Sequence, residues 1–119
     1  ITLMYGLDES VKPEEVLDRL QFSGQVVAKL GRLSLFKNDG LDVLKYEVKS
    51  TDLNHLRDVL EEYPYKTDYP EFVPHVTVAY LQPNTGWKYL FRTELDGRIL
   101  KLNQLRFVQK TQNTRVLSF

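Results

Sequence analysis

The stretch Pro74–Leu81, PHVTVAYL, places a histidine and a threonine two positions apart in an apolar run. Alternate side chains of a β-strand share a face, so His75 and Thr77 are expected to project together. An imidazole can pass a proton near neutral pH, and a hydroxyl can donate a hydrogen bond to a phosphoryl oxygen. This pair suits acid/base chemistry on a phosphate ester. Taken alone, the pattern is a weak signal and favours the alternative, a half-buried strand histidine with local hydrogen bonds.

The start of the chain resembles this stretch. ITLMYGL aligns with VTVAYLQ, so Thr2 corresponds to Thr77 and Tyr5 to Tyr80. The two tyrosines lie three positions beyond their threonines, and we expect both to face away from the threonine side and to pack in the core. The alignment favours a duplicated domain in which the two threonines lie on opposite walls of a cleft. The alternative is that β-hairpins share hydrophobic patterns in general.

The long extended runs that follow also align, with Ala28–Leu35 matching Leu100–Phe107. In each run apolar residues alternate with others until one place where two residues, instead of one, separate the apolar positions. The place is between Leu30 and Leu33 in the first run and between Leu102 and Leu105 in the second. A strand of period two cannot do so without switching faces or carrying a bulge. Each run then leads to a similar closing strand, Val43–Tyr46 in the first and Val116–Phe119 in the second. The shared irregularity supports a repeat more strongly than shared hydrophobicity would.

Apolar periodicity and turn residues predict the order β-α-β-β-α-loop-β-α-β-β. Asn38-Asp39-Gly40 is a hairpin signal, and Ser50 or Thr51 can cap the second helix. The expected strands cover 1–6, 25–37, 41–49, 76–81, 98–109 and 115–119, and the expected helices cover 13–22, 51–63 and 85–91. We therefore expect an α+β domain over residues 1–119, bilobal and duplicated, with two small antiparallel sheets flanked by helices around a central cleft.

The length and composition of the chain exclude several classes of protein. The chain has 119 residues, 42% of them hydrophobic, with 16 basic and 16 acidic side chains and no cysteine. This length fits one domain, and the balanced charge gives no global attraction to nucleic acid or to an anionic membrane. No apolar run approaches membrane-spanning length. We expect no membrane partner, no disulfide and a cytoplasmic location.

With its two motifs in this order, the chain resembles the 2H phosphoesterase superfamily, which includes bacterial 2′–5′ RNA ligase and cyclic-phosphodiesterase proteins. The resemblance covers nearly the whole chain in element order, and its specific part is the two strand motifs. The forms TLMYGL and HVTVAYLQPNTGWKYL look most like phage and viral members, some of which cleave cyclic nucleotide signals. A phage member would act in the host cytoplasm, as part of a larger protein or associated with one.

The resemblance implies roles for three residues. His75 would be one catalytic histidine, Thr77 its phosphate-binding partner and Thr2 the hydroxyl of the first motif. The histidine of the first motif would fall one position before Ile1, and we expect a longer native chain to supply it. The implied reaction uses one histidine as base and one as acid, with no metal and no cofactor. Hydrolysis and ligation both remain open, as do the oligomeric state and the alternative of a catalytically impaired nucleotide- or RNA-binding module.

Other side chains are candidates for substrate binding. Aromatic residues before the second motif can form a lid that stacks on a base, or can simply hold the loop down. Trp87 and Lys88 follow a turn where a helix start could offer backbone N–H groups to an anion, although the pattern more often means that Trp87 packs the helix on the sheet. His55 is read as a surface histidine. The loop aromatics are Tyr65, Tyr69 and Phe72, and a basic cluster in the last third comprises Arg98, Lys101, Arg106, Lys110 and Arg115.

Overall fold

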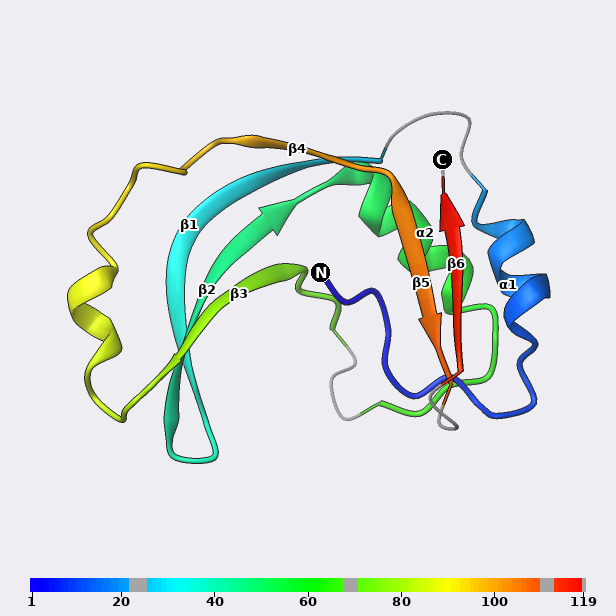
Figure 1. The fold of residues 1–119 in the computed structure, drawn as a ribbon, viewed down its shortest axis with the longest axis horizontal. Helices are drawn as coiled ribbons and strands as arrows, with labels where there is room; N and C mark the ends of the chain where they lie inside the picture. Colours follow the sequence, from blue (N-terminus) through cyan, green and yellow to red (C-terminus); the bar gives the residue numbers. More distant parts are fainter. Residues whose placement is uncertain (22–25, 68–70, 110–112, 119) are drawn as a thin grey trace.

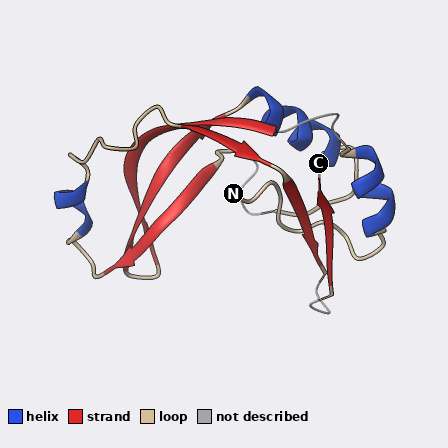
Figure 2. Cartoon of the chain, turned by 45° about the horizontal axis from the view of Figure 1, so that its top comes forward, coloured by secondary structure: helices blue, strands red, loops and turns tan. Residues whose placement is uncertain are grey.

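The computed structural model of the chain describes residues 1–21, 26–67, 71–109 and 113–118, and in that part the fold is α+β. Four strands form a strongly curved antiparallel sheet in the order β3-β2-β1-β4, and β5 pairs with β6 in a second antiparallel sheet (Figure 1). Helices α1 and α2 lie at one end of the molecule and the short 3-10 helix η1 at the other (Figure 2). The elements are α1 (Pro13–Arg19), β1 (Val26–Asn38), β2 (Leu41–Lys49), α2 (Thr51–Leu60), β3 (His75–Leu81), η1 (Gly86–Tyr89), β4 (Ile99–Leu102), β5 (Gln104–Val108) and β6 (Thr114–Ser118).

The hairpin between β1 and β2 follows from its two turn residues. Asp39 has φ 50° and Gly40 has φ 75°, so both central positions are left-handed. Two positive φ values are typical of a type I′ turn, whose twist matches that of the flanking strands. The predicted hairpin is confirmed, and its register aligns Phe36 of β1 with Val43 of β2.

Both α-helices begin where the sequence predicts. Pro13 occupies the first turn of α1, where its missing N–H costs nothing. The Ser50 hydroxyl accepts a hydrogen bond of 3.1 Å from the backbone N–H of Leu53, so the predicted cap of α2 is confirmed. Among the described residues, no helix is long and apolar enough to cross a membrane.

The phase slip of the two long runs has a different structural basis in each. In β1 the register with β2 shifts between Leu30 and Leu33, and this β-bulge keeps both leucines on one face. In the second run β4 ends at Leu102 and β5 begins at Gln104, in the other sheet. The same irregularity in sequence is a bulge in one place and a passage between sheets in the other.

The closing strands also differ in register from the alignment of their sequences. Leu105 of β5 lies opposite Leu117 of β6, whereas Leu33 of β1 lies opposite Tyr46 of β2. Leu105 aligns with Leu33 in sequence. By strand pairing Leu117 therefore corresponds to Tyr46, whereas the sequence alignment matches it with Leu44. An offset of two residues leaves every side chain on the same face, so the hydrophobic pattern could not detect it.

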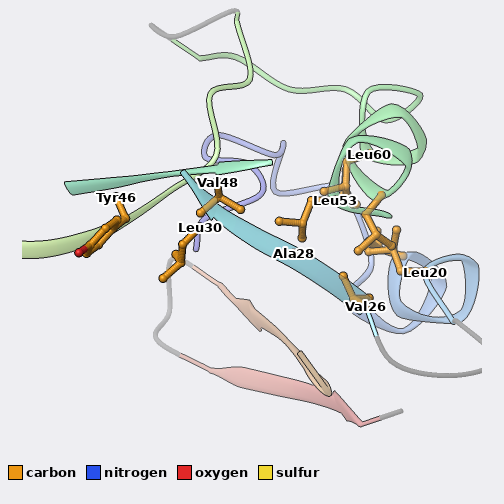
Figure 3. Close-up of a cluster of buried hydrophobic side chains, with 11 residues drawn as sticks. Leu20, Val26, Ala28, Leu30, Tyr46, Val48, Leu53 and Leu60 are labelled. Atoms are coloured by element: carbon orange, nitrogen blue, oxygen red, sulfur yellow. The ribbon is translucent and has the colours of Figure 1, made fainter. Parts of the chain in front are cut away.

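The main core lies between one face of the large sheet and the two helices. Side chains of α2 meet Val26 and Ala28 of β1, each 1% exposed (Figure 3). The buried members are Val11, Val16, Leu20, Val26, Ala28, Leu30, Tyr46, Val48, Leu53, Leu56 and Leu60. Tyr46 and Val48 of β2 therefore define the core side of the sheet, and the residues that alternate with them point to its other side.

The predicted strand over residues 1–6 is wrong, because this segment is irregular and pairs only briefly with the loop after α2. Leu7 forms an isolated bridge with Tyr65, and the backbone N–H of Lys66 donates a hydrogen bond of 2.8 Å to the Gly6 carbonyl. Gly6 has φ 84°, and a Cβ there would collide with the Lys66 carbonyl oxygen. The chain turns at Gly6 instead of continuing along a sheet edge.

Candidate functional site

His75 and Thr77 lie on the face of the large sheet that is opposite the core. His75 is the cross-strand partner of Glu47, and Thr77 is the partner of Lys45. Cross-strand partners project to the same side of a sheet, and Lys45 and Glu47 alternate with the buried Tyr46. The His-x-Thr pair therefore shares a surface with one cation and one carboxylate from β2.

Strand β1 extends this surface on the other side of β2. Ser34 is the partner of Lys45, and Phe36 lies two residues further along the same face. We call this surface the motif face, and it comprises Ser34, Phe36, Lys45, Glu47, His75 and Thr77. Lys45 is at its centre, because it lies between Ser34 and Thr77 in one row across three strands.

The His75 ring is oriented by two contacts. Its Nδ1 is 3.0 Å from the Val73 carbonyl oxygen. Because a carbonyl can only accept, Nδ1 carries the proton in this contact and the neutral ring keeps a lone pair on Nε2. The ring also meets Phe36 edge-on, with 6.3 Å between centroids. In this arrangement Nε2 is the nitrogen available to take up a proton.

Lys45 is the functional candidate that sequence reasoning missed. Its Nζ lies 5.2 Å from the centroid of the Phe36 ring, within the range of a cation–π contact. Among the described residues no carboxylate forms an ion pair with Lys45. The sequence shows that Lys45 interrupts the apolar residues of β2, but its position opposite Thr77 is seen only in the structure.

The tyrosines of the two motifs are not core residues. Tyr80 is 67% exposed and Tyr5 is 71% exposed, so the expectation of core packing is wrong for both. Tyr80 was also expected to face away from Thr77. A register shift places an extra residue, Val78, between the rows of Thr77 and Ala79, so that Tyr80 returns to the face of Thr77.

Thr2 belongs to the irregular N-terminal segment and is exposed. It lines a cavity of about 860 Å³ between this segment and β5, and neither His75 nor Thr77 lines that cavity. In both views the N-terminus nevertheless lies next to the start of β3, the strand that begins at His75 (Figures 1 and 2). The structure thus brings the chain end near His75 without forming a cavity common to Thr2 and Thr77.

The loop aromatics enclose an arginine rather than an open surface. The Arg57 guanidinium carbon lies 5.7 Å from the ring centroid of Tyr65 and 5.4 Å from that of Phe72. Arg57 is 5% exposed, and its Nη1 donates a hydrogen bond of 2.6 Å to the Leu3 carbonyl. Tyr69, the third predicted member, lies outside the described residues. This arrangement fits the interpretation in which the aromatics hold the loop down.

Trp87 and Lys88 are placed far from His75. Gly86, which begins η1, donates its backbone N–H to Asp42 Oδ2 at 2.9 Å, so this N–H is not free for an external anion. Asp42 lies five residues from the row of His75, a separation of about 17 Å along β2. Trp87 is 60% exposed, so it does not pack the helix on the sheet.

The Asp42 carboxylate is the clearest case of a perturbed acid. It is 2% exposed, and the hydrogen bond from the Gly86 N–H holds its pKa below the usual range despite burial, with a smaller contribution from Lys37. The Lys37 Nζ is 3.9 Å from Asp42 Oδ1 and its side chain is 70% exposed. Asp42 therefore acts as an ionised anchor that fixes η1 to the first residues of β2, an inner strand of the sheet.

The remaining candidates are solvent-facing. His55 lies on the exposed side of α2. Arg98, Lys101, Arg106 and Arg115 are all exposed, and Lys110 lies outside the described residues. Arg115 Nε is 3.4 Å from Glu14 Oε1, so part of this basic charge is paired within the chain. Within the described ranges no three metal-ligating side chains are grouped closely enough to hold an ion.

Comparisons with protein-family models, with curated proteins and with solved structures gave no significant match to this chain.

Proposed function

We propose that the intact protein is a metal-independent phosphodiesterase of the 2H type. Its substrates would be 2′,3′-cyclic, 2′-5′-linked or cyclic-oligonucleotide phosphodiesters. One observation carries the proposal: His75 and Thr77 share the motif face with Lys45, and the contact of Nδ1 with Val73 leaves Nε2 free. A proton acceptor, a hydroxyl donor and a cation on one surface suit a phosphate ester.

In the proposed reaction the chain's own groups move protons and hold oxygens. His75 Nε2 takes a proton from water as its oxygen forms a bond to phosphorus, and the bond from phosphorus to the leaving ribose oxygen breaks. A second histidine protonates that leaving oxygen, and the roles can be exchanged between the two. Thr77 donates a hydrogen bond to a non-bridging oxygen, where negative charge grows in the transition state. Thr2 would do the same from the first motif.

We further propose that the domain is duplicated about a pseudo-twofold axis, with the site between its halves. The register of β1 with β4 supports this idea, because Ala28 lies opposite Leu100, the residue with which it aligns in sequence. Because the strands are antiparallel, the residues on either side of this pair then exchange partners between aligned positions, which is the relation that a twofold axis produces. The flanking pairs are Val27 with Lys101 and Lys29 with Ile99.

The second histidine is proposed at the encoded position that precedes Ile1. The closeness of the N-terminus to the start of β3 supports this placement, because a residue added there would lie near His75 (Figure 1). The codon before Ile1 in the gene tests it directly. Any residue other than histidine at that position would contradict the two-histidine mechanism.

A nucleotide- or RNA-binding module is the second candidate. The observation that favours it is that, among the described residues, the motif face carries a single histidine. Thr77 and Lys45 suffice to bind a phosphate group, whereas in-line cleavage needs both a base and an acid. Such a module would retain binding and lack turnover.

The deciding experiment is an assay of the full-length protein in a metal chelator. Its substrates are 2′,3′-cyclic nucleotides, 2′-5′ dinucleotides and cyclic dinucleotides, and the variants are His75→Ala and Thr77→Ala with His55→Ala as control. We expect turnover by the wild type and by the control, and a loss of about 10²–10⁴-fold in kcat for His75→Ala. Binding without turnover favours the module. Neither binding nor turnover of any of these compounds overturns the proposal.

A further inference from the structure

Lys45 differs from the other lysines of the large sheet in where its charge is placed. It is half-buried and lies between Ser34 and Thr77 in one row. By contrast, Lys29 and Lys49 are exposed partners of one another in a row beyond the motif face. Because no carboxylate among the described residues forms an ion pair with Lys45, its ammonium group is available to an external anion.

The surroundings of Lys45 fix the position of its charge relative to His75. The Lys45 Nζ and the His75 ring both lie against Phe36, at 5.2 Å and 6.3 Å from its centroid. Phe36 belongs to β1 and His75 to β3, so the two rings reach toward each other above β2, where Lys45 originates. The ammonium group and the imidazole therefore border the same space.

Thr77 forms the third side of this space. Directly opposed residues of an antiparallel pair have Cβ atoms about 5 Å apart, which is close enough for one oxygen to contact both side chains. The carboxylate of Glu47 occupies the next row, beside His75, and would repel an anion there. An anion is thus favoured over the Lys45–Thr77 row rather than over the Glu47–His75 row.

From this geometry we infer that Lys45 binds a non-bridging phosphoryl oxygen of the ligand, together with Thr77 and within reach of His75 Nε2. The inference rests on the proposed phosphate chemistry of the motif face and adds a charged contact that the His-x-Thr pair does not contain. It assigns the ligand class as a phosphate mono- or diester. Phe36 is the positioning residue, since its ring contacts both the ammonium group and the imidazole.

The test compares Lys45→Met, Lys45→Arg and Lys49→Met in the full-length protein. Methionine keeps an unbranched apolar side chain and removes the charge, so the variant tests the ammonium group itself. Lys49 is the matched control, because it lies on β2 and on the same side of the sheet as Lys45, in a row beyond the six residues of the motif face. Binding of inorganic phosphate and of 2′,3′-cyclic AMP is followed by amide chemical shifts of β2 and β3. Thermal unfolding of each variant checks that it is folded.

We expect Lys45→Met to weaken binding of both probes by about 10- to 100-fold, the range for loss of a charge-assisted hydrogen bond. Phosphate binding by Lys45→Met should also depend less on salt concentration than binding by the wild type does. We expect Lys45→Arg and Lys49→Met to bind within about threefold of the wild type, because each keeps the charge in the site. KM for the cyclic nucleotide should rise more than kcat falls.

The outcomes separate this inference from the proposed function. If Thr77→Ala weakens binding and a folded Lys45→Met does not, the assignment of Lys45 is wrong and the phosphodiesterase proposal stands. Equal losses in Lys45→Met and Lys49→Met would show a general electrostatic effect, which also overturns the assignment. If neither probe shifts the β2 and β3 amides of the wild-type protein, the motif face is not a phosphate site and both proposals fail.

Discussion

The ring of Phe36 meets the edge of the His75 imidazole at a centroid separation of 6.3 Å and an interplanar angle of 75°, although β2 lies between their two strands. An edge-to-face contact of this kind favours one ring orientation of the histidine. The Lys45 ammonium group is held against the same ring. Phe36 therefore links the two polar groups on which the proposed chemistry depends.

Replacement of Phe36 by leucine should lower activity while leaving the fold intact. Aromatic pairs contribute about 0.5–1.5 kcal/mol, so we expect kcat/KM on 2′,3′-cyclic nucleotides to fall by about 2- to 10-fold. The control is Phe91→Leu, because Phe91 is 81% exposed and outside the motif face. Equal activity of the two variants would contradict a positioning role for Phe36.

Replacement of Arg57 by methionine should loosen the N-terminal segment. Arg57 Nη1 donates to the Leu3 carbonyl, Nε donates to Glu61 Oε1 at 3.1 Å, and the guanidinium lies against two rings. Loss of such charged hydrogen bonds should destabilise the protein by about 2 kcal/mol. Urea unfolding measures this loss, and limited proteolysis should cut the first residues faster. The control Arg92→Met breaks an exposed pair with Glu94 and should cost less than about 1 kcal/mol.

Asp42 should make stability depend on pH in acid. Its folded-state pKa is held below the usual value by the Gly86 N–H, whereas in the unfolded chain it should be about 4. The ionised carboxylate therefore stabilises the fold above about pH 4, and this contribution is lost as the pH falls through the lower folded-state pKa. Asp42→Asn should flatten the change in the free energy of unfolding between pH 5 and pH 2.5. The exposed Asp58→Asn variant should keep the wild-type slope, and a flattened slope there would refute the assignment to Asp42.

Gly6→Ala should destabilise the protein more than Gly40→Ala. Both glycines have positive φ, at 84° and 75°, so alanine costs about 1–2 kcal/mol at each from backbone strain alone. At Gly6 the added Cβ also collides with the Lys66 carbonyl, whereas at Gly40 nothing lies within 4 Å. Urea unfolding of the two variants measures the difference. Equal losses would mean that the N-terminal segment does not pack against the loop as described.

The sequence alone determined the features that depend on local chemistry. Asp39-Gly40 set the hairpin because these residues tolerate positive φ, and the Ser50 hydroxyl set the start of α2 because it can satisfy a free N–H. The phase slip after Leu30 predicted either a bulge or a change of face, and the structure shows a bulge in β1 and a passage between sheets in the second run. The α+β class with antiparallel sheets followed from these elements.

The tertiary structure decided which distant segments meet, because strand partners and register depend on contacts between segments far apart in the chain. Lys45 became a candidate only through its pairing with Thr77, and Tyr80 changed face because of a bulge at Val78. The segment 1–6 is apolar enough for a strand, yet it lies along the loop after α2, where Arg57 holds it through Leu3. Hydrophobic pattern sets which face of a strand is apolar but not which strand it will pair with.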